Sequence, residues 1–171
     1  AAFELLHWSA LRIGDAVRVG PGHVDRKGVL IHSQSKVKEP AFIPWTGALP
    51  VYAMEYADDR NLMRRALDAQ KVRQMTFLAT RQGAPRSDKA LGNMIREAAR
   101  EAGVEKSAHG LRKTRGIALA EAGASAHQIM SWLGHQTLKE AEHYTRLANR
   151  RRAVMGVCEG SSQTSAFRQK P

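Results

Sequence analysis

The sequence predicts a mainly helical α+β domain that contains a small antiparallel β-sheet. Apolar residues recur at helical spacing over most of the chain, two short β-branched segments lie close together within 28–43, and the last third carries two helix-capping signatures. The chain has 171 residues, of which 43% are hydrophobic and 25% charged. This composition is typical of one globular domain with a sizeable core.

The beginning of the chain is expected to combine short helices with a hairpin. Apolar spacing over 2–9 and 11–19 predicts two short helices or one kinked helix, which ends at the Gly-Pro-Gly of 20–22. Residues 28–32 and 41–43 are apolar and β-branched, and they flank a polar stretch that contains lysines. This pattern predicts two strands joined by a turn.

Two longer helices are predicted in the middle of the chain, over 58–72 and 88–103. A short strand at 75–78 and a turn-rich stretch over 81–88 are expected between them.

The last third is expected to form three helices with well-defined ends. The first covers 109–122, and Ser125 and Thr137 each begin an S/T-x-x-E/Q capping box, so two more helices should start directly after these residues. Gly134 stands where the first of these two helices needs a left-handed C-cap. His135 is therefore predicted to lie in a tight turn between two helices.

The charge of the chain favours a polyanionic partner. It carries 27 lysine and arginine residues against 16 aspartate and glutamate residues, a formal net charge of +11. Most of the positive residues are arginine, whose planar guanidinium suits bidentate contacts to phosphate. A solubilising basic surface would produce the same net charge, so charge alone defines no site.

Cysteine usage and the absence of export signals predict a cytoplasmic protein. Cys158 is the only cysteine, which excludes an internal disulfide and a cysteine-based zinc site. No apolar run approaches the roughly 18 residues that cross a bilayer, and no signal peptide is present, so we expect a soluble protein with no membrane partner. The chain begins inside an apolar segment without an initiator methionine, and we interpret it as an N-terminally truncated piece of a longer protein.

Two pairs of residues could carry chemistry. His109 and Arg112 stand three residues apart, on one face of a helix, and together could hold a phosphate. His135 lies in the predicted turn, and Tyr144 follows nine residues later, near the second turn of the next helix. Taken singly, each feature is usually structural. The histidines show no metal-ligand spacing, so no metal site is predicted.

Four short segments, in this order along the chain, make a combined pattern: Ala10-Leu11-Arg12, His109-Gly110-Leu111-Arg112, Leu133-Gly134-His135 and Tyr144-Thr145. The pattern resembles the catalytic domain of the tyrosine recombinase (phage integrase) family over residues 1 to about 155. The resemblance implies the catalytic fold of that family. It also implies site-specific DNA recombination, in integration or excision, through a covalent 3′-phosphotyrosine intermediate, with no metal or other cofactor.

The resemblance also assigns roles to five residues. Tyr144 is the expected nucleophile, and Arg12 and Arg112 are expected to clamp the non-bridging oxygens of the scissile phosphate. His109 would act as a general base or orient the tyrosine, and His135 would hydrogen-bond the phosphate.

The general acid of the family is a lysine in a β-hairpin turn. Lys36 occupies that place here, with Lys38 as a competitor. Asp15 stands where the family has an acidic residue and is expected to support the arginine or its helix. Two departures from the family pattern are Ala10, in place of a common glycine, and Arg115-Gly116, after the H-x-x-R segment.

Double-stranded DNA is the expected partner. The residues predicted to contact it are Lys38, Lys113, Arg146 and Arg150, although a solvated helix face is an equal interpretation for the arginines after the tyrosine. The longer protein is expected to be a tetramer on DNA, associated with the nucleoid of a bacterium or phage host, while the piece alone can be monomeric. We assign 1–157 to the catalytic domain and 158–171 to a polar, flexible tail.

Two alternatives remain open at this point. The same tyrosine chemistry would serve a type IB topoisomerase, which relaxes supercoils without exchanging partners. Residues 125–152 could instead form a helix-turn-helix module that binds DNA without cutting it.

Overall fold

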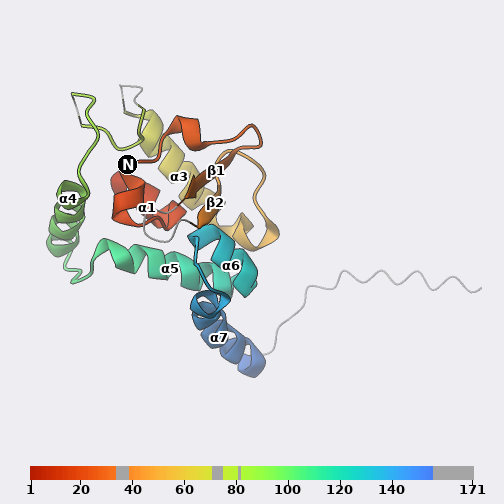
Figure 1. Ribbon diagram of the computed structural model, residues 1–171. Helices are drawn as coiled ribbons and strands as arrows, with labels where there is room; N and C mark the ends of the chain where they lie inside the picture. The colour runs from red at the N-terminus through yellow and green to blue at the C-terminus, as the bar shows by residue number, and fades with distance from the viewer. Residues whose placement is uncertain (34–38, 71–74, 81, 156–171) are drawn as a thin grey trace, which may run out of the picture.

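The computed structural model describes residues 1–33, 39–70, 75–80 and 82–155. Within these ranges the chain forms seven α-helices, two 3₁₀ turns and one two-stranded sheet (Figure 1). The predicted fold class, mainly helical with a small antiparallel sheet, is confirmed. The elements in order are α1 Ala2–Ser9, α2 Ile13–Ala16, η1 Pro21–His23, β1 Val29–Ser33, β2 Pro40–Pro44, η2 Val51–Tyr56, α3 Ala57–Asp68, α4 Asp88–Glu101, α5 Ala108–Glu121, α6 Ala126–Leu133 and α7 Leu138–Met155.

The predicted hairpin is present as β1 and β2, which pair antiparallel with Leu30 opposite Ile43 and His32 opposite Ala41. Alternate residues of each strand are buried, as expected for a sheet with one face on the core: Leu30 and Ile43 are fully buried, whereas Phe42 points outward. The turn between the strands, residues 34–38, lies outside the described residues.

The N-terminal helices are separate, so the prediction of two short helices is confirmed over the alternative of one kinked helix, but the second, predicted over 11–19, covers only Ile13–Ala16. The break follows Ser9, whose hydroxyl accepts a hydrogen bond from the Leu11 backbone N–H at 3.2 Å. Ala10 adopts a left-handed conformation with φ 56°, which turns the chain. Arg12 then becomes the N-cap residue of α2, in an extended conformation.

The predicted strand at 75–78 is wrong. Residues 75–78 form a bend and a turn, in which the Phe77 N–H donates to the Val19 oxygen at 2.9 Å and the Phe77 oxygen accepts from Nε2 of Gln70 at 3.0 Å. The Phe77 ring stacks on Trp45, with centroids 4.8 Å apart. Phe77 and Leu78 contribute their side chains to the core, whereas Met75 is exposed.

Two predicted helices end earlier than expected. The helix predicted over 58–72 is α3 and ends at Asp68, and the last two residues of the predicted range lie outside the described residues. The helix predicted over 88–103 is α4 and ends at Glu101. Gly103 has a positive φ of 71°, which carries the chain away from the helix axis.

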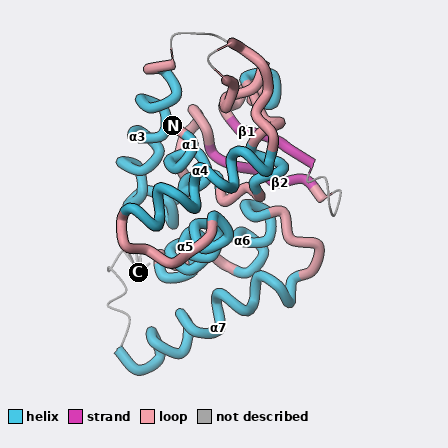
Figure 2. Tube along the Cα trace, turned by 90° about the vertical axis from the view of Figure 1, so that its left-hand side faces the viewer, coloured by secondary structure: helices cyan, strands magenta, loops and turns pink. Residues whose placement is uncertain are grey.

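The C-terminal helices pack around α5. Helix α7 lies against α5 and α6, on the side away from the sheet, as both views of the molecule show (Figure 2). Trp132 on α6 packs edge-on against Trp8 on α1, with ring centroids 5.1 Å apart, so the two ends of the chain share one core. Within the described ranges, no helix is both long and apolar enough to span a bilayer.

One of the two predicted capping boxes is formed in full. The Ser125 N–H donates to Oε1 of Gln128 at 2.7 Å, and the Gln128 N–H donates to Oγ of Ser125 at 3.2 Å. At the start of α7 the Thr137 hydroxyl instead donates to the Glu140 carboxylate at 3.4 Å. The two hydroxyls thus have different roles although their sequence motifs match.

We expect Ser125→Ala to lower the free energy of unfolding by about 1 kcal/mol, because the Gln128 N–H at the start of α6 loses its acceptor. Thr137→Ala is the matched control and is expected to cost only a few tenths of a kcal/mol, as for a single exposed contact. Urea denaturation followed by circular dichroism measures both. Equal losses for the two variants would contradict the assignment.

Candidate active site

Arg112 is the centre of the candidate site. Its side chain is only 3% exposed, and it donates from Nη1 to the Ala10 oxygen at 2.7 Å and from Nη2 to the Leu133 oxygen at 2.8 Å. It therefore joins the break after α1 to the end of α6. Burial, together with the nearby charge of Arg12, lowers the pKa of Arg112 to about 10, which leaves it charged at neutral pH.

Arg12 and His135 both present a buried nitrogen beside Arg112. Nη1 of Arg12 and Nδ1 of His135 are buried without a hydrogen-bond partner among the described residues. The charges of both arginines act on His135, which places the three side chains within electrostatic range of one another. Buried polar atoms without partners are rare in proteins, and two beside a charged guanidinium form a local receptor for an anionic oxygen.

His135 is positioned by the predicted left-handed C-cap of α6. Gly134 has φ 62°, and the His135 N–H donates to the Met130 oxygen at 3.0 Å. The imidazole is 7% exposed and stacks on the Tyr144 ring, with centroids 5.8 Å apart and an interplanar angle of 8°. Burial and the charge of Arg112 lower the pKa of His135 to about 4, so the ring is neutral near pH 7.

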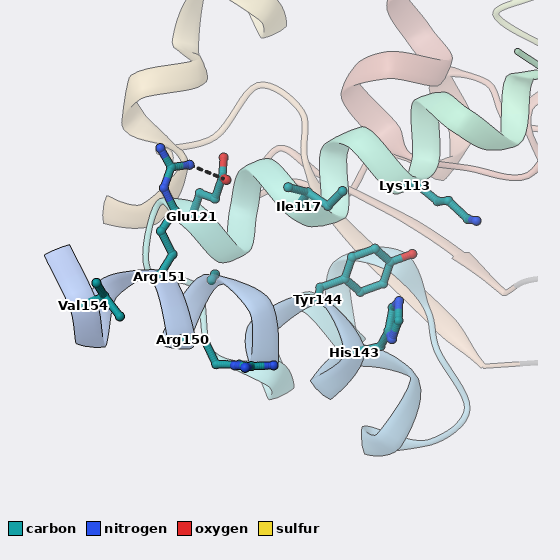
Figure 3. Close-up of a pocket in the computed structure, with 9 residues that line it drawn as sticks. Lys113, Ile117, Glu121, His143, Tyr144, Arg150, Arg151 and Val154 are labelled. Carbon is teal, nitrogen blue, oxygen red and sulfur yellow. Dashed lines mark hydrogen bonds and ion pairs between the residues drawn. The ribbon is translucent and has the colours of Figure 1, made fainter. Parts of the chain in front are cut away.

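Tyr144 lies in a groove of about 680 Å³ between α5 and α7. Figure 3 shows its hydroxyl toward the same end of the groove as Lys113, whereas the Arg151–Glu121 ion pair lies toward the other end. Burial raises the pKa of the Tyr144 phenol, and the Arg112 charge partly opposes this shift. The phenol is therefore protonated at neutral pH and needs a proton acceptor before it can attack.

His109 stands on the exposed side of the first turn of α5. Burial and the charges of Lys113, Arg112 and Arg12 lower its pKa, which favours the neutral imidazole that can accept a proton. The fold thus brings five of the predicted catalytic residues to one region. They come from the N-cap of α2, from α5, from the turn after α6 and from α7.

Asp15 is 1% exposed and contacts a residue that sequence reasoning did not single out. Its Oδ1 lies 3.2 Å from Nε2 of His32, a buried residue on β1. The backbone N–H of Asp15 donates to the Arg12 oxygen at 3.0 Å. Asp15 therefore links α2, the helix that Arg12 caps, to the hairpin, which is consistent with a supporting role.

The remaining predicted residues divide into three groups. Lys36 and Lys38 lie outside the described residues. Lys113 and Arg150 are exposed and line the groove that contains Tyr144. Arg146 is exposed on a different side of α7, where it lines a shallow pocket with Ser125, and the structure does not bring it to the groove.

The sequence marked Arg115 and Gly116 of α5 as departures from the family pattern but did not predict what either residue contacts. Arg115 is buried and reaches α1 and α3, away from the site. Gly116 lies directly against the Tyr144 ring. A glycine inside a helix costs about 0.5–1 kcal/mol relative to alanine, so its position in the middle of α5 was a signal that close packing is required there.

No group of three or more metal-ligating side chains is present in the described part of the chain.

The low pKa of His135 predicts that acid destabilises the protein. The unfolded imidazole binds a proton below its ordinary pKa of 6.5, whereas the folded one does so only near 4, so stability falls as pH decreases through this window. The full effect is on the order of 3 kcal/mol, of which about 1 kcal/mol is lost between pH 7.5 and 5.5. His135→Gln should show a correspondingly weaker pH dependence in urea denaturation, and an unchanged dependence would refute the prediction.

Comparison with known proteins agrees with this arrangement. Residues 1–151 match the Phage integrase family, and the chain belongs to this family. Tyrosine recombinase XerC of Bifidobacterium longum is 30% identical over 156 residues, which cover 86% of this chain and 43% of that protein. Tyrosine recombinase XerC of Corynebacterium efficiens is 26% identical, over 88% of this chain and 47% of that protein. The chain thus spans less than half the length of these curated relatives.

Solved structures share the fold. A lambda integrase dimer bound to a COC′ core site superposes with a TM-score of 0.66 and 24% identity, over 84% of this chain and 50% of that one. XerA recombinase superposes with a TM-score of 0.67 and 17% identity, over 89% of this chain and 55% of that one. The family resemblance seen in the sequence is confirmed.

Proposed function

We propose that this chain is the catalytic part of a site-specific recombinase, which cuts and rejoins double-stranded DNA through a covalent bond between Tyr144 and a DNA phosphate. The observation that carries the proposal is the anion receptor beside the tyrosine: the buried Arg112 guanidinium, flanked by buried nitrogens of Arg12 and His135 that have no hydrogen-bond partner within the described ranges. A phosphodiester offers the two non-bridging oxygens that such a receptor would bind.

In the proposed reaction the Tyr144 oxygen attacks the phosphorus. An oxygen–phosphorus bond forms to the tyrosine while the bond from phosphorus to the 5′ oxygen breaks, which yields a 3′-phosphotyrosine and a 5′ hydroxyl. One ester bond replaces another, so the bond energy is retained and the reverse step rejoins the strand. Arg12 and Arg112 stabilise the charge that builds up on the non-bridging oxygens in the transition state.

Two proton transfers accompany this exchange. The phenol proton passes to a base, for which His109 is our choice because its lowered pKa favours the neutral imidazole. His135 hydrogen-bonds the phosphate. The 5′ oxygen takes its proton from an acid, which we assign to Lys36, with Lys38 as the competitor. Asp15 holds α2, and with it Arg12, in place through its contact with His32 on β1.

Lys113 and Arg150 are proposed to contact the DNA backbone beside the scissile phosphate, since both line the groove that holds Tyr144. Lys38 and Arg146 are proposed to contact the DNA backbone elsewhere. If these contacts form, DNA affinity should fall steeply with salt concentration.

We further propose that the whole protein self-associates on DNA and acts in the cytoplasm, at the nucleoid of a bacterium or phage host. Lambda integrase, a structural neighbour, forms a tetramer bound to a Holliday junction. Residues 153–171 are proposed to dock on a neighbouring subunit. Deleting them would then abolish pairing of two DNA duplexes but spare cleavage.

The proposal is tested with a series of overlapping nicked duplexes that together cover the DNA on both sides of the gene that encodes this protein. A nick near the cleavage point traps the covalent intermediate. We expect a covalent protein–DNA adduct on denaturing electrophoresis, formed equally in the presence of a chelator, and no adduct with Tyr144→Phe. Adduct formation by Tyr144→Phe would refute the role of Tyr144. Cleavage that a chelator abolishes would indicate a metal-dependent nuclease, and binding without cleavage would favour a helix-turn-helix binder.

The test also separates the recombinase from a type IB topoisomerase. A recombinase joins strands from two duplexes that carry the same site, whereas a topoisomerase only relaxes supercoiled DNA. Strand exchange between two labelled duplexes is the expected result.

A further inference from the structure

We propose that Gly116 is a positioning residue for Tyr144: the missing side chain lets the tyrosine ring lie directly against α5, in the orientation that stacks it on His135. The inference rests on the proposed function, because it concerns the proposed nucleophile. It also explains why a residue that departs from the family pattern occupies the middle of this helix.

The distances around Gly116 carry the proposal. A Cβ atom built at this position would lie 2.7 Å from Cε1, 2.9 Å from Cδ1 and 3.0 Å from Cζ of Tyr144. These are consecutive ring atoms along the side that leads to the hydroxyl. The other three glycines in α-helices differ: an added Cβ would meet nothing within 4 Å at Gly14, and single side-chain atoms at 3.5 Å for Gly92 and 3.7 Å for Gly110, which is ordinary contact.

The backbone of α5 is held on both sides of Gly116: Arg112 and Arg115 anchor it before this residue, and the Tyr56 hydroxyl donates to the Ala118 oxygen at 3.0 Å after it. Arg112 donates to the Ala10 and Leu133 oxygens from within the core. Arg115, the adjacent residue, donates to the His7 oxygen at 3.0 Å and to Asp59 at 2.6 Å. A side chain at position 116 must therefore displace the tyrosine and not the backbone of α5.

The expected displacement is large for a nucleophile. Moving the nearest ring atom from 2.7 Å to the 3.4 Å of ordinary contact requires about 0.7 Å. The parallel stack on His135 limits the directions in which the ring can go. A misplacement of about 1 Å at a reacting atom can cost on the order of 100-fold in rate, so Gly116→Ala should slow cleavage by 10-fold to about 100-fold.

The ring position is tested without DNA, by fluorine NMR of protein labelled with 3-fluorotyrosine. The Tyr144 resonance is identified by its loss in Tyr144→Phe. We expect Gly116→Ala to shift or broaden this resonance and to leave those of Tyr52 and Tyr56 unchanged. Gly92→Ala, which adds the same methyl group to a distant helix, should move none of them. An unchanged Tyr144 resonance in Gly116→Ala overturns the proposal.

The functional consequence is tested on the nicked duplexes. Gly116→Ala should form the covalent adduct 10-fold to 100-fold more slowly while binding the duplex with a Kd within twofold of the wild type. A displaced resonance with an unchanged rate overturns the positioning role. If the wild type forms no adduct, the proposed function fails together with the effect on rate, whereas the NMR result still decides whether Gly116 seats the ring.

A rescue experiment covers the case in which Gly116→Ala does not fold. Removing the ring in Gly116→Ala/Tyr144→Ala should restore folding, as judged by circular dichroism, because the clash involves that ring. A double variant that also fails to fold overturns the proposal.

Discussion

Arg112→Lys is expected to slow covalent adduct formation by on the order of 10²–10³-fold. Lysine retains the charge but not the planar fork, so it cannot hold the Ala10 and Leu133 oxygens and still present donors to a phosphate. The same substitution should destabilise the protein by about 1–3 kcal/mol, because at least one buried carbonyl loses its partner. Single-turnover cleavage and urea denaturation measure the two effects separately.

Arg12→Lys is the matched control for this prediction. Nη1 of Arg12 has no hydrogen-bond partner in the described part of the chain. Loss of the guanidinium in Arg12→Lys should therefore slow cleavage by a comparable factor but leave the free energy of unfolding within about 0.5 kcal/mol of the wild type. If Arg112→Lys lost stability but cleaved at the wild-type rate per folded molecule, Arg112 would be a purely structural residue and the proposed receptor would be wrong.

Arg115→Met is expected to produce the opposite pattern, a loss of about 3 kcal/mol in the free energy of unfolding with cleavage per folded molecule retained within a few-fold. Arg115 is 1% exposed and pairs with Asp59 at 2.6 Å. Its guanidinium carbon also lies 5.1 Å from the Trp8 ring centroid and 5.0 Å from that of Tyr56. These contacts tie α5 to α1 and α3.

Asp59→Asn serves as the control for the second prediction. The Asp59 side chain is about one-third exposed, and the amide can still accept a hydrogen bond from Arg115, so we expect a loss of only about 1 kcal/mol. Urea denaturation gives the stability, and the burst of adduct gives the fraction of active molecules. A cleavage defect in Arg115→Met as large as that of Arg112→Lys would contradict the separation between the two arginines.

The sequence-level predictions succeeded where the signal is local. The hairpin, the two N-terminal helices and the capping box at Ser125 depend on residues within a few positions of one another. The left-handed Gly134 and the turn position of His135 were predicted for the same reason. The strand predicted at 75–78 is wrong because Phe77 and Leu78 pack onto the core as part of a turn while Met75 is exposed, and in the described part of the chain no strand pairs with them.

The residues of the candidate site were predicted from the sequence, but their positions and contacts in space were not. The order of the segments that contain Arg12, His109, Arg112, His135 and Tyr144 identified the family, which the comparisons then confirmed. The catalytic roles of these residues remain predictions. The pattern contained no information on what holds Arg112, because its two carbonyl partners lie 102 and 21 residues away in the sequence.

The sequence alone therefore determined the fold class, the family and the residues to be tested. Only the tertiary structure decided what holds Arg112 in place, that Arg115 reaches α1 and α3, that His32 contacts Asp15, and that Gly116 lies against the Tyr144 ring. The physical reason is the range of the interactions. Periodicity and capping act over one or two helical turns, whereas buried polar groups and close packing depend on segments that meet only when the chain has folded.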